Sequence, residues 1–212
     1  MEKICSCCGK KVEVFEVDEK EYFKKLGLPN SMEARDYYML WHFMVEKCDD
    51  CDCVSRDISN CEKSKEIVGS DAYKNLFDEN EKELNSRSNI GFLEYVKYGY
   101  IQERLGNYLE SGKAYFLASD LAFATYYQVL LEDDEVDGFE TVCDKYFKKA
   151  LEQFQLAYEN SDDIEAKVLY IAGLLADEDE NKSKALQIVK EFLAFNPPEK
   201  YKNIVKFLLK NC

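Results

Sequence analysis

The chain has 212 residues and a formal net charge of −14, with 46% hydrophobic and 33% charged residues. This composition is typical of a globular protein rather than a disordered one, and the length suffices for one large or two small domains. Because nucleic-acid affinity rests largely on Lys and Arg that neutralise phosphates, the acidic balance counts against DNA, RNA or an anionic membrane surface as a partner.

Three features of the sequence indicate the compartment. The opening residues MEKICSCC contain no apolar stretch of the kind found in a signal peptide, and no run of about eighteen apolar residues predicts a membrane span. Nine cysteines in such a chain favour a reducing cytosol, where clustered cysteines bind metal more often than they form disulfides. We therefore expect a cytoplasmic protein that does not insert into membranes.

Two Cys-x-x-Cys pairs near the N-terminus predict a metal site. Cys5 and Cys8 form the first pair, which a glycine follows, and Cys48 and Cys51 form the second, which an aspartate follows. One tight turn can present two sulfurs to one ion, and the residue after it often needs a positive φ, which Gly adopts freely and Asp tolerates. Two such turns supply the four thiolates of a structural Zn²⁺ site, whose filled coordination shell leaves no open position for hydrolysis.

Three other residues lie close enough in sequence to be considered for this site. Cys7 and Cys53 each lie two residues from an expected ligand, and we interpret both as packing thiols. A shift of register that makes either one a ligand stays open, as does a redox role for the neighbouring Cys7 and Cys8. His42 is the single histidine, and its place in an apolar run favours a packed ring over a metal ligand.

The residues between the two cysteine pairs predict additional structure. Residues 11–18 alternate polar and apolar side chains as a strand does, and residues 19–27 show the spacing of one helical face. Residues 37–47 are apolar almost throughout and fit either a buried strand or a capped helix. We favour a strand for their last half because ribbon turns join strands. A zinc-ribbon-like module is therefore expected over residues 1–62.

Beyond this module, residues 63–212 predict an all-α domain. Apolar residues recur at helical spacing from 69 to 87, where Ser70 is the expected N-cap. Helical spacing then returns in the segments 92–121, about 120–132, 146–160, 166–197 and 198–210, of which the last suits a capping helix. We therefore predict a mainly α protein in which a small β module precedes an antiparallel helical domain.

Two of these segments have the spacing of a tetratricopeptide repeat. Small residues are expected where two antiparallel helices approach closely, and aromatic residues are expected to fill the adjoining spaces. A glycine turn is expected between the two helices, and a proline at the end of the repeat. In the first segment these positions are Tyr95, Gly99, Gly106, Tyr108, Ser111, Tyr115 and Ala118. In the second they are Gly173, Ala185 and Pro197. The alternative is a generic antiparallel bundle in which these matches arise by chance.

The order of these features resembles a bacterial family of unknown function that has an N-terminal zinc ribbon followed by tetratricopeptide-like repeats. The resemblance spans most of the chain: Cys5, Cys8, Cys48 and Cys51 match the ribbon cysteines, and LGNYLESGKAYFLA matches the best repeat. This chain lacks the usual Pro inside each pair and the Gly after the second one. The resemblance implies an architecture and no activity.

The sequence favours a binding function over catalysis. No phosphate-binding glycine loop, nucleophile elbow or HExxH motif occurs, so we expect no enzyme. We expect a cytosolic adaptor that binds a partner peptide or helix in the groove of the stacked helices. The groove-facing positions in this register are, on the first helix of the first repeat, Leu93, Val96, Tyr100, Glu103 and Arg104. On the first helix of the last repeat they are Lys167, Tyr170, Leu174, Asp177 and Glu178.

Other interpretations of the sequence stay open. The chain's own N-terminal module could cover several of the groove positions. A zinc ribbon associated with transcription or nucleic acid would need a lysine cluster, for which the candidates are Lys10, Lys11, Lys24 and Lys25. A redox switch would release zinc when the cysteines of the first pair and Cys7 are oxidised.

Overall fold

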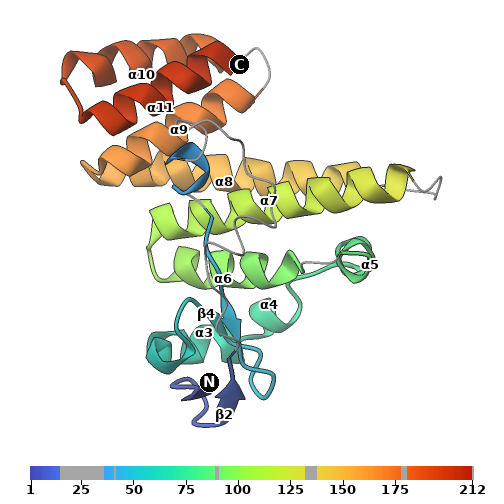
Figure 1. Cartoon of the computed structure of the whole chain (residues 1–212). Helices are drawn as coiled ribbons and strands as arrows, with labels where there is room; N and C mark the ends of the chain where they lie inside the picture. Colours follow the sequence, from blue (N-terminus) through green and yellow to red (C-terminus); the bar gives the residue numbers. More distant parts are fainter. Residues whose placement is uncertain (15–35, 41, 89–90, 132–137, 178–180, 212) are drawn as a thin grey trace. The chain divides into compact units, whose positions relative to one another are not determined.

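The structure is a computed structural model that describes residues 1–14, 36–40, 42–88, 91–131, 138–177 and 181–211. It is mainly helical, with two small sheets near the N-terminus followed by packed antiparallel helices, which confirms the predicted fold class (Figure 1). Two compact units form: unit 1 holds the described residues of Met1–Glu16 and Phe43–Ala150, and unit 2 those of Val17–His42 and Leu151–Cys212. No helix within the described ranges is long and apolar enough to cross a membrane.

Unit 1 begins with two antiparallel hairpins. β1 (Glu2–Ile4) pairs with β2 (Lys11–Glu13), and β3 (Glu46–Lys47) pairs with β4 (Val54–Ser55). Each hairpin encloses one of the two Cys-x-x-Cys pairs between its strands. The two hairpins therefore present both cysteine pairs at their turns.

The predicted elements of this region agree with the structure in part. The strand expected over 11–18 begins as β2, and the strand favoured for the last half of 37–47 is present as β3. Residues 36–38 are helical, so the apolar run over 37–47 begins in a helical turn and ends in β3. The helix expected over 19–27 lies outside the described residues.

Short helices connect the second hairpin to the longer ones. They are η1 (Ile58–Asn60), η2 (Glu62–Ser64), α3 (Lys65–Gly69), α4 (Asp71–Lys74) and α5 (Glu79–Ser86). The single helix expected over 69–87 is therefore wrong. Ser70 does cap a helix, accepting a hydrogen bond from the Tyr73 backbone N–H at 3.2 Å. Asp78 forms a capping box with Glu81 and starts a separate helix there, so local capping overrides the continuous apolar spacing.

α6 (Leu93–Arg104) and α7 (Tyr108–Leu131) form the first long hairpin, whose turn places Gly106 at a φ of +76°. Gly99 of α6 lies against α7, and its carbonyl accepts a hydrogen bond from Ser111 Oγ at 2.9 Å. The two helices thus approach closely where the sequence has small residues. The separate helix expected at about 120–132 is wrong, because α7 continues unbroken through that region.

α8 (Phe139–Asn160) begins in unit 1 and ends in unit 2. It includes the helix expected over 146–160 and begins earlier than that segment. In unit 1, the Tyr146 ring stacks on the Tyr115 ring of α7 with centroids 6.2 Å apart. Such aromatic pairs contribute roughly 0.5–1.5 kcal/mol beyond the area they bury.

A buried carboxylate joins α5 to the first half of α8. Glu81 is fully buried and accepts hydrogen bonds from the Asp78 backbone N–H at 2.8 Å, from Lys145 Nζ at 2.6 Å and from the Tyr146 hydroxyl. An unpaired carboxylate in this position would be costly, so the bonds from Lys145 and Tyr146 attach α8 to α5.

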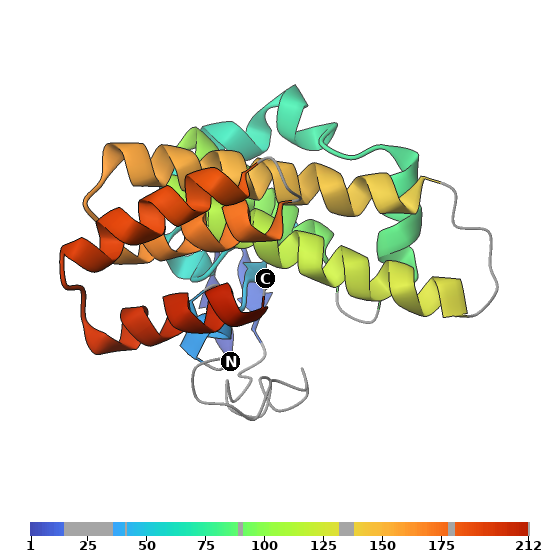
Figure 2. The same ribbon diagram turned by 90° about the horizontal axis from the view of Figure 1, so that it is seen from above.

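Unit 2 contains α9 (Ile164–Ala176), α10 (Lys182–Ala194) and α11 (Glu199–Asn211) after the end of α8. Both α10 and α11 pack on α9 (Figure 2). The helices expected over 166–197 and the final helix expected over 198–210 are all present.

The two units group the chain differently from the boundary expected after residue 62. Both cysteine hairpins share unit 1 with α6 and α7. One apolar core contains Cys5 and Cys48 from the hairpins, Tyr73 from α4, and Tyr100 and Ile101 from α6. The boundary between 1–62 and 63–212 stays a prediction about which segment folds alone.

The close approach of α6 and α7 makes a stability prediction for Gly99→Ala. A Cβ on Gly99 would lie 3.1 Å from ring carbons of Tyr115 and 3.3 Å from Ala114 Cβ. We expect a loss of about 1–3 kcal/mol in the free energy of unfolding, because packed helices must separate to admit the methyl group. Gly69→Ala is the control, since nothing lies within 4 Å of its added Cβ. Urea denaturation followed by circular dichroism measures both, and equal midpoints would contradict the prediction.

Candidate metal centre

The two cysteine turns have the same backbone geometry. In the first, the N–H of Gly9 donates to the Cys5 carbonyl at 2.7 Å, and in the second the N–H of Asp52 donates to the Cys48 carbonyl at 2.7 Å. Gly9 has a φ of +78° and Asp52 a φ of +60°. The residue after each pair therefore adopts the left-handed conformation that the sequence led us to expect.

The structure brings the four predicted ligands together. The Sγ atoms of Cys5, Cys8, Cys48 and Cys51 all lie within 4.8 Å of one another. Cys5 and Cys51 are 3.8 Å apart, and Cys8 and Cys48 are 3.6 Å apart. A tetrahedral ion with sulfur ligands at about 2.3 Å requires edges of about 3.8 Å. The four thiols can therefore hold a metal ion without rearrangement of the turns.

The chemistry of the donor set fits a soft dication. Cys5 and Cys48 are fully buried, Cys51 is half-buried and Cys8 is exposed. Burial raises the pKa of the Cys48 and Cys51 thiols, because a thiolate loses hydration there. The backbone N–H of Lys10 lowers the pKa of Cys8. A bound dication would offset the cost of ionising the buried thiols, which is why clustered cysteines bind metal as thiolates.

Contacts from two helices hold the second cysteine turn in place. The Asp52 carbonyl accepts a hydrogen bond from the Tyr73 hydroxyl of α4 at 2.7 Å. The Asp52 carboxylate pairs with Lys97 of α6 at 2.5 Å and lies 3.8 Å from Lys47. Asp52 therefore supplies both the left-handed backbone of the turn and its ionic attachment to the helices.

A second group of polar contacts holds the two hairpins to each other. Lys3 of β1 pairs with Glu46 of β3 at 2.7 Å and with Asp57 at 3.0 Å. The other Glu46 oxygen accepts the backbone N–H of Ile58 at 2.8 Å. These bonds fix the strands that carry the turns, so the four sulfurs are positioned from outside the site as well as by their own loops.

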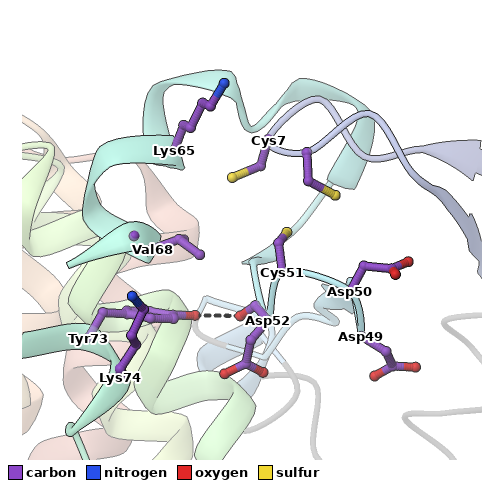
Figure 3. A pocket seen from close by; sticks show the side chains of 11 residues that line it. Cys7, Asp49, Asp50, Cys51, Asp52, Lys65, Val68, Tyr73 and Lys74 are labelled. Atoms are coloured by element: carbon purple, nitrogen blue, oxygen red, sulfur yellow. Dashed lines mark hydrogen bonds between the residues drawn. The ribbon is translucent and has the colours of Figure 1, made fainter. Parts of the chain in front are cut away.

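A cavity of about 570 Å³ opens beside the four thiols (Figure 3). Its lining combines thiols, carboxylates and lysines: Cys7, Cys8, Cys51, Asp49, Asp50, Asp52, Lys65, Lys74, Val68, Gly69 and Tyr73. Figure 3 shows Cys7 and Cys51 extending into the same space from different segments. The candidate centre is thus reached by small solutes from one side.

The surplus thiols lie in the core beside the centre. Cys7 is 6% exposed and Cys53 is fully buried, as the packing interpretation expects. Sequence reasoning missed Cys61, which is also buried and whose Sγ lies 4.0 Å from that of Cys5. Cys61 has no partner at Cys-x-x-Cys spacing, so only its place among nine cysteines could have indicated it.

His42 is not a member of the group of described residues that could hold a metal ion. Its Nδ1 lies 2.9 Å from the Tyr38 carbonyl, to which it donates a hydrogen bond, and the rings of His42 and Tyr38 are 5.4 Å apart. Burial lowers the pKa of His42 to about 4. The expectation of a packed ring agrees with this position.

The expected groove positions on α6 are partly buried in the structure. Val96 and Tyr100 are buried, with 1% and 7% of their surfaces exposed. Tyr100 packs on Tyr73 with ring centroids 6.1 Å apart, and both belong to the core that contains the cysteines. The N-terminal module therefore covers this part of the groove, as one alternative allowed. Leu93 and Glu103 are half-buried, and Arg104 is exposed with its guanidinium 5.0 Å from the Tyr100 ring.

The expected groove positions on α9 are also mostly core. Tyr170 and Leu174 are 1% and 2% exposed, and the Tyr170 ring packs against Tyr158 of α8 in unit 2. Lys167 and Asp177 are half-buried, and Glu178 lies outside the described residues. The helical spacing located the apolar side of α9 correctly, but that side is filled by its neighbours.

Comparison of the chain with protein-family models, curated proteins and solved structures gave no match. The resemblance to a bacterial zinc-ribbon and repeat family therefore stays a prediction.

The low pKa of His42 predicts a pH-dependent stability. Its folded pKa of about 4 lies below the ordinary value of 6.5, so the unfolded chain binds the proton first as pH falls. The neutral His42 ring therefore contributes at most about 3 kcal/mol to the free energy of unfolding. This contribution is complete above pH 6.5 and declines as the pH falls from 6.5 to 4.

Proton NMR tests this directly, because a single histidine gives one ring Hε1 resonance. We expect its titration midpoint near pH 4, and a midpoint near 6.5 would contradict the buried ring. Denaturation of His42→Gln between pH 7 and 4.5 is the control, since that variant should lose less stability than the wild type.

Proposed function

We propose that this protein is a cytosolic, non-enzymatic interaction protein that contains structural zinc and binds a partner peptide or helix through its tetratricopeptide-like helices. The observation that carries the proposal is the four-thiol centre, built into the same core as the first helical hairpin. Four thiolates complete a tetrahedral shell, and such sites are structural. Zinc is the metal most often held by two Cys-x-x-Cys turns.

In this proposal, zinc stabilises unit 1 by joining its two cysteine hairpins at their centre. Structural zinc contributes on the order of 10 kcal/mol to folding at neutral pH. The cysteine hairpins contact α4 and α6 through Tyr73 and Lys97. Zinc binding would therefore stabilise the first helical hairpin as well as the hairpins that ligate it.

Metal analysis tests the structural site. We expect at least one zinc ion per purified chain, its loss in Cys48→Ser, and its retention in Cys143→Ser, which alters a buried thiol of α8 outside the centre. Elemental analysis gives the metal content, and ¹H–¹⁵N spectra before and after chelation report folding. A wild-type chain that is free of metal yet folded would overturn the proposal.

The surface that best suits a partner lies in unit 2, on α8, α9 and α10. A groove of about 140 Å³ is lined by Tyr158, Ile164, Lys167, Ile188, Glu191, Phe192, Phe195 and Pro197. Phe195 is 85% exposed. It ends α10, and the next residue, Asn196, turns the chain with a φ of +52° and accepts a hydrogen bond from Lys202 at 2.6 Å. The turn holds this phenyl ring at the protein surface.

The charges around this groove indicate the chemistry of its partner. Glu191 is an exposed member of the lining, and the loop between α8 and α9 carries the exposed side chains of Asp162 and Asp163. The lining cation, Lys167, lies 3.7 Å from Asp162 of that loop. An apolar floor with an acidic rim suits an amphipathic segment whose bulky apolar anchor is flanked by Lys or Arg.

A random peptide library displayed on phage tests this assignment. We expect enrichment of sequences with a large apolar residue beside Lys or Arg, and at least about tenfold weaker binding to Phe195→Ala, a loss of roughly 1.4 kcal/mol. Leu131→Ala removes an exposed leucine of α7 and is the matched control. Fluorescence polarisation of a labelled selected peptide measures the affinities. Equal affinity for the two variants, or no enrichment, would reject the groove.

The N-terminal module offers less support for nucleic-acid binding. Lys3 and Lys47 lie beside carboxylates, and Lys11 pairs with Glu2 at 3.0 Å. Lysines already paired with carboxylates neutralise phosphates poorly. Among the described residues, Lys10 is the only other member of the expected cluster, because Lys24 and Lys25 lie outside them.

A further inference from the structure

The second half of α7 exposes a group of large apolar side chains. Its members are Phe123, which is 56% exposed, Tyr127 at 57%, Leu130 at 43% and Leu131 at 69%. Residues three or four apart are neighbours on one side of a helix, so these four side chains form one continuous surface, the α7 patch. A contiguous exposed apolar surface of this kind marks an interaction site.

The other side of the same segment is packed inside unit 1. Leu121, Ala122, Thr125 and Val129 are all buried there. A helix that is apolar all round is normally covered all round, whereas a helix at the surface carries polar side chains on its outer side. The packing within the chain covers one side of this segment and leaves the α7 patch exposed.

The segment also carries no charge. Residues 121–131 contain no Asp, Glu, Lys or Arg, in a chain in which 33% of residues are charged. The first half of α8, in the same unit, is an ordinary surface helix by comparison, and it exposes Glu140, Asp144, Lys145 and Lys148. Loss of charged residues together with exposed aromatic ones is the composition of the centre of a protein interface.

We propose that the α7 patch is a self-association surface, at which two copies of this chain pack α7 against α7 across a two-fold axis. In such an interface each copy contributes the same surface, so one uncharged apolar patch meets an identical one. Tyr127 is the central member of the patch along the helix and lies nearest the axis. The inference goes beyond the proposed function, and it depends on neither the zinc site nor the groove of unit 2.

Charge favours a second copy over other occupants. Each chain has a net charge of −14, so two copies repel each other over most of their surfaces and approach with least repulsion at an uncharged patch. A basic amphipathic segment would find no carboxylate within residues 121–131 to pair with its cations. An anionic membrane would find no Lys or Arg there to hold it. An uncharged apolar surface suits the patch, and the chain itself supplies one.

The size of the α7 patch suits a dimer. A fully covered aromatic side chain buries about 150–250 Å², so the four partly exposed side chains present roughly 400 Å² per copy. A standard interface covers about 800 Å² on each partner, of which roughly 60% is apolar. The patch therefore supplies most of the apolar area that a stable dimer needs, and neighbouring polar side chains complete the rim.

Sedimentation equilibrium of the full chain tests the proposal, with a reducing agent present to prevent disulfides between chains. Over about 1–200 µM we expect the mass to rise from that of one chain, 24.7 kDa, toward twice that value. Phe123→Ala and Tyr127→Ala should raise the dissociation constant at least about tenfold, because each removes two buried rings from the dimer.

Phe195→Ala is the matched control, since it makes the same change at an exposed phenylalanine of unit 2. We expect it to dimerise as the wild type does. A wild-type chain that stays monomeric throughout the range would overturn the proposal. Equal dimerisation of Phe123→Ala and the wild type would overturn it too, as would a loss in Phe195→Ala as large as that in Phe123→Ala. Circular dichroism checks that each variant is folded.

Salt dependence and a pair of charged variants test the nature and symmetry of the interface. Raising NaCl from about 50 to 500 mM should strengthen the dimer, because it screens the repulsion between two acidic chains. A weaker dimer would indicate an ionic interface elsewhere and reject the patch. Tyr127→Lys and Tyr127→Glu should each dimerise poorly, and an equal mixture should form more dimer than either alone, since opposite charges then meet at the axis. No gain on mixing would reject the two-fold arrangement.

Discussion

The meeting of the two cysteine turns is the contact on which unit 1 depends, because the hairpins around it have little other core. The buried aliphatic side chains they contribute are Val12, Val54 and, just beyond the second hairpin, Ile58. Strands of two or three residues cannot form a stable sheet alone. Sulfur atoms occupy the centre that aliphatic groups would fill in a larger domain, and small modules of this kind normally need a metal to fold. Gly9 and Asp52 both have a positive φ. This backbone conformation lets each short loop direct two sulfurs to one point.

The centre also reaches into the helices, which explains why the compact unit does not end at the ribbon. Tyr73 and Lys97 bind the second turn, while Tyr95 of α6 donates to the Phe43 carbonyl at 3.1 Å. The Arg56 guanidinium lies 3.9 Å from the centre of the Phe43 ring and pairs with Glu110 of α7 at 2.7 Å. The Tyr73 bond comes from α4, whereas Lys97, Tyr95 and Glu110 join residues in or beside the second hairpin to the first long helix pair. Free energy gained by an ion bound at the thiols would thereby be shared with α6 and α7, so metal binding would couple to helix packing in unit 1.

What the sequence could predict follows from the range of the interactions involved. The cysteine turns, the Ser70 cap and the Gly106 turn are set by neighbours within a few residues, and all were predicted. The single helix over 69–87 was wrong because the Asp78 capping box, which is also local, was overlooked in favour of apolar spacing. The groove positions on α6 show a different limit. Spacing shows which side of a helix is apolar, but it does not show whether a partner or the chain itself covers that side, and Tyr100 is covered by the chain. Cys61 was missed because its proximity to Cys5 is a tertiary contact without a spacing signal.

Electrostatics sets a limit on how the centre can be built. A dication held by four thiolates carries a net charge of −2, and the second turn adds three aspartates, Asp49, Asp50 and Asp52. Asp49 and Asp50 lie at the mouth of the cavity, where water screens their charge, and the side chain of Asp49 is 95% exposed. Asp52 is less exposed, and Lys97, which is only 14% exposed, lies against it together with Lys47. The lysines therefore compensate the carboxylate that the turn cannot direct into solvent. An aspartate at this left-handed position obtains a cation from α6, and the same ion pair attaches the turn to the helix.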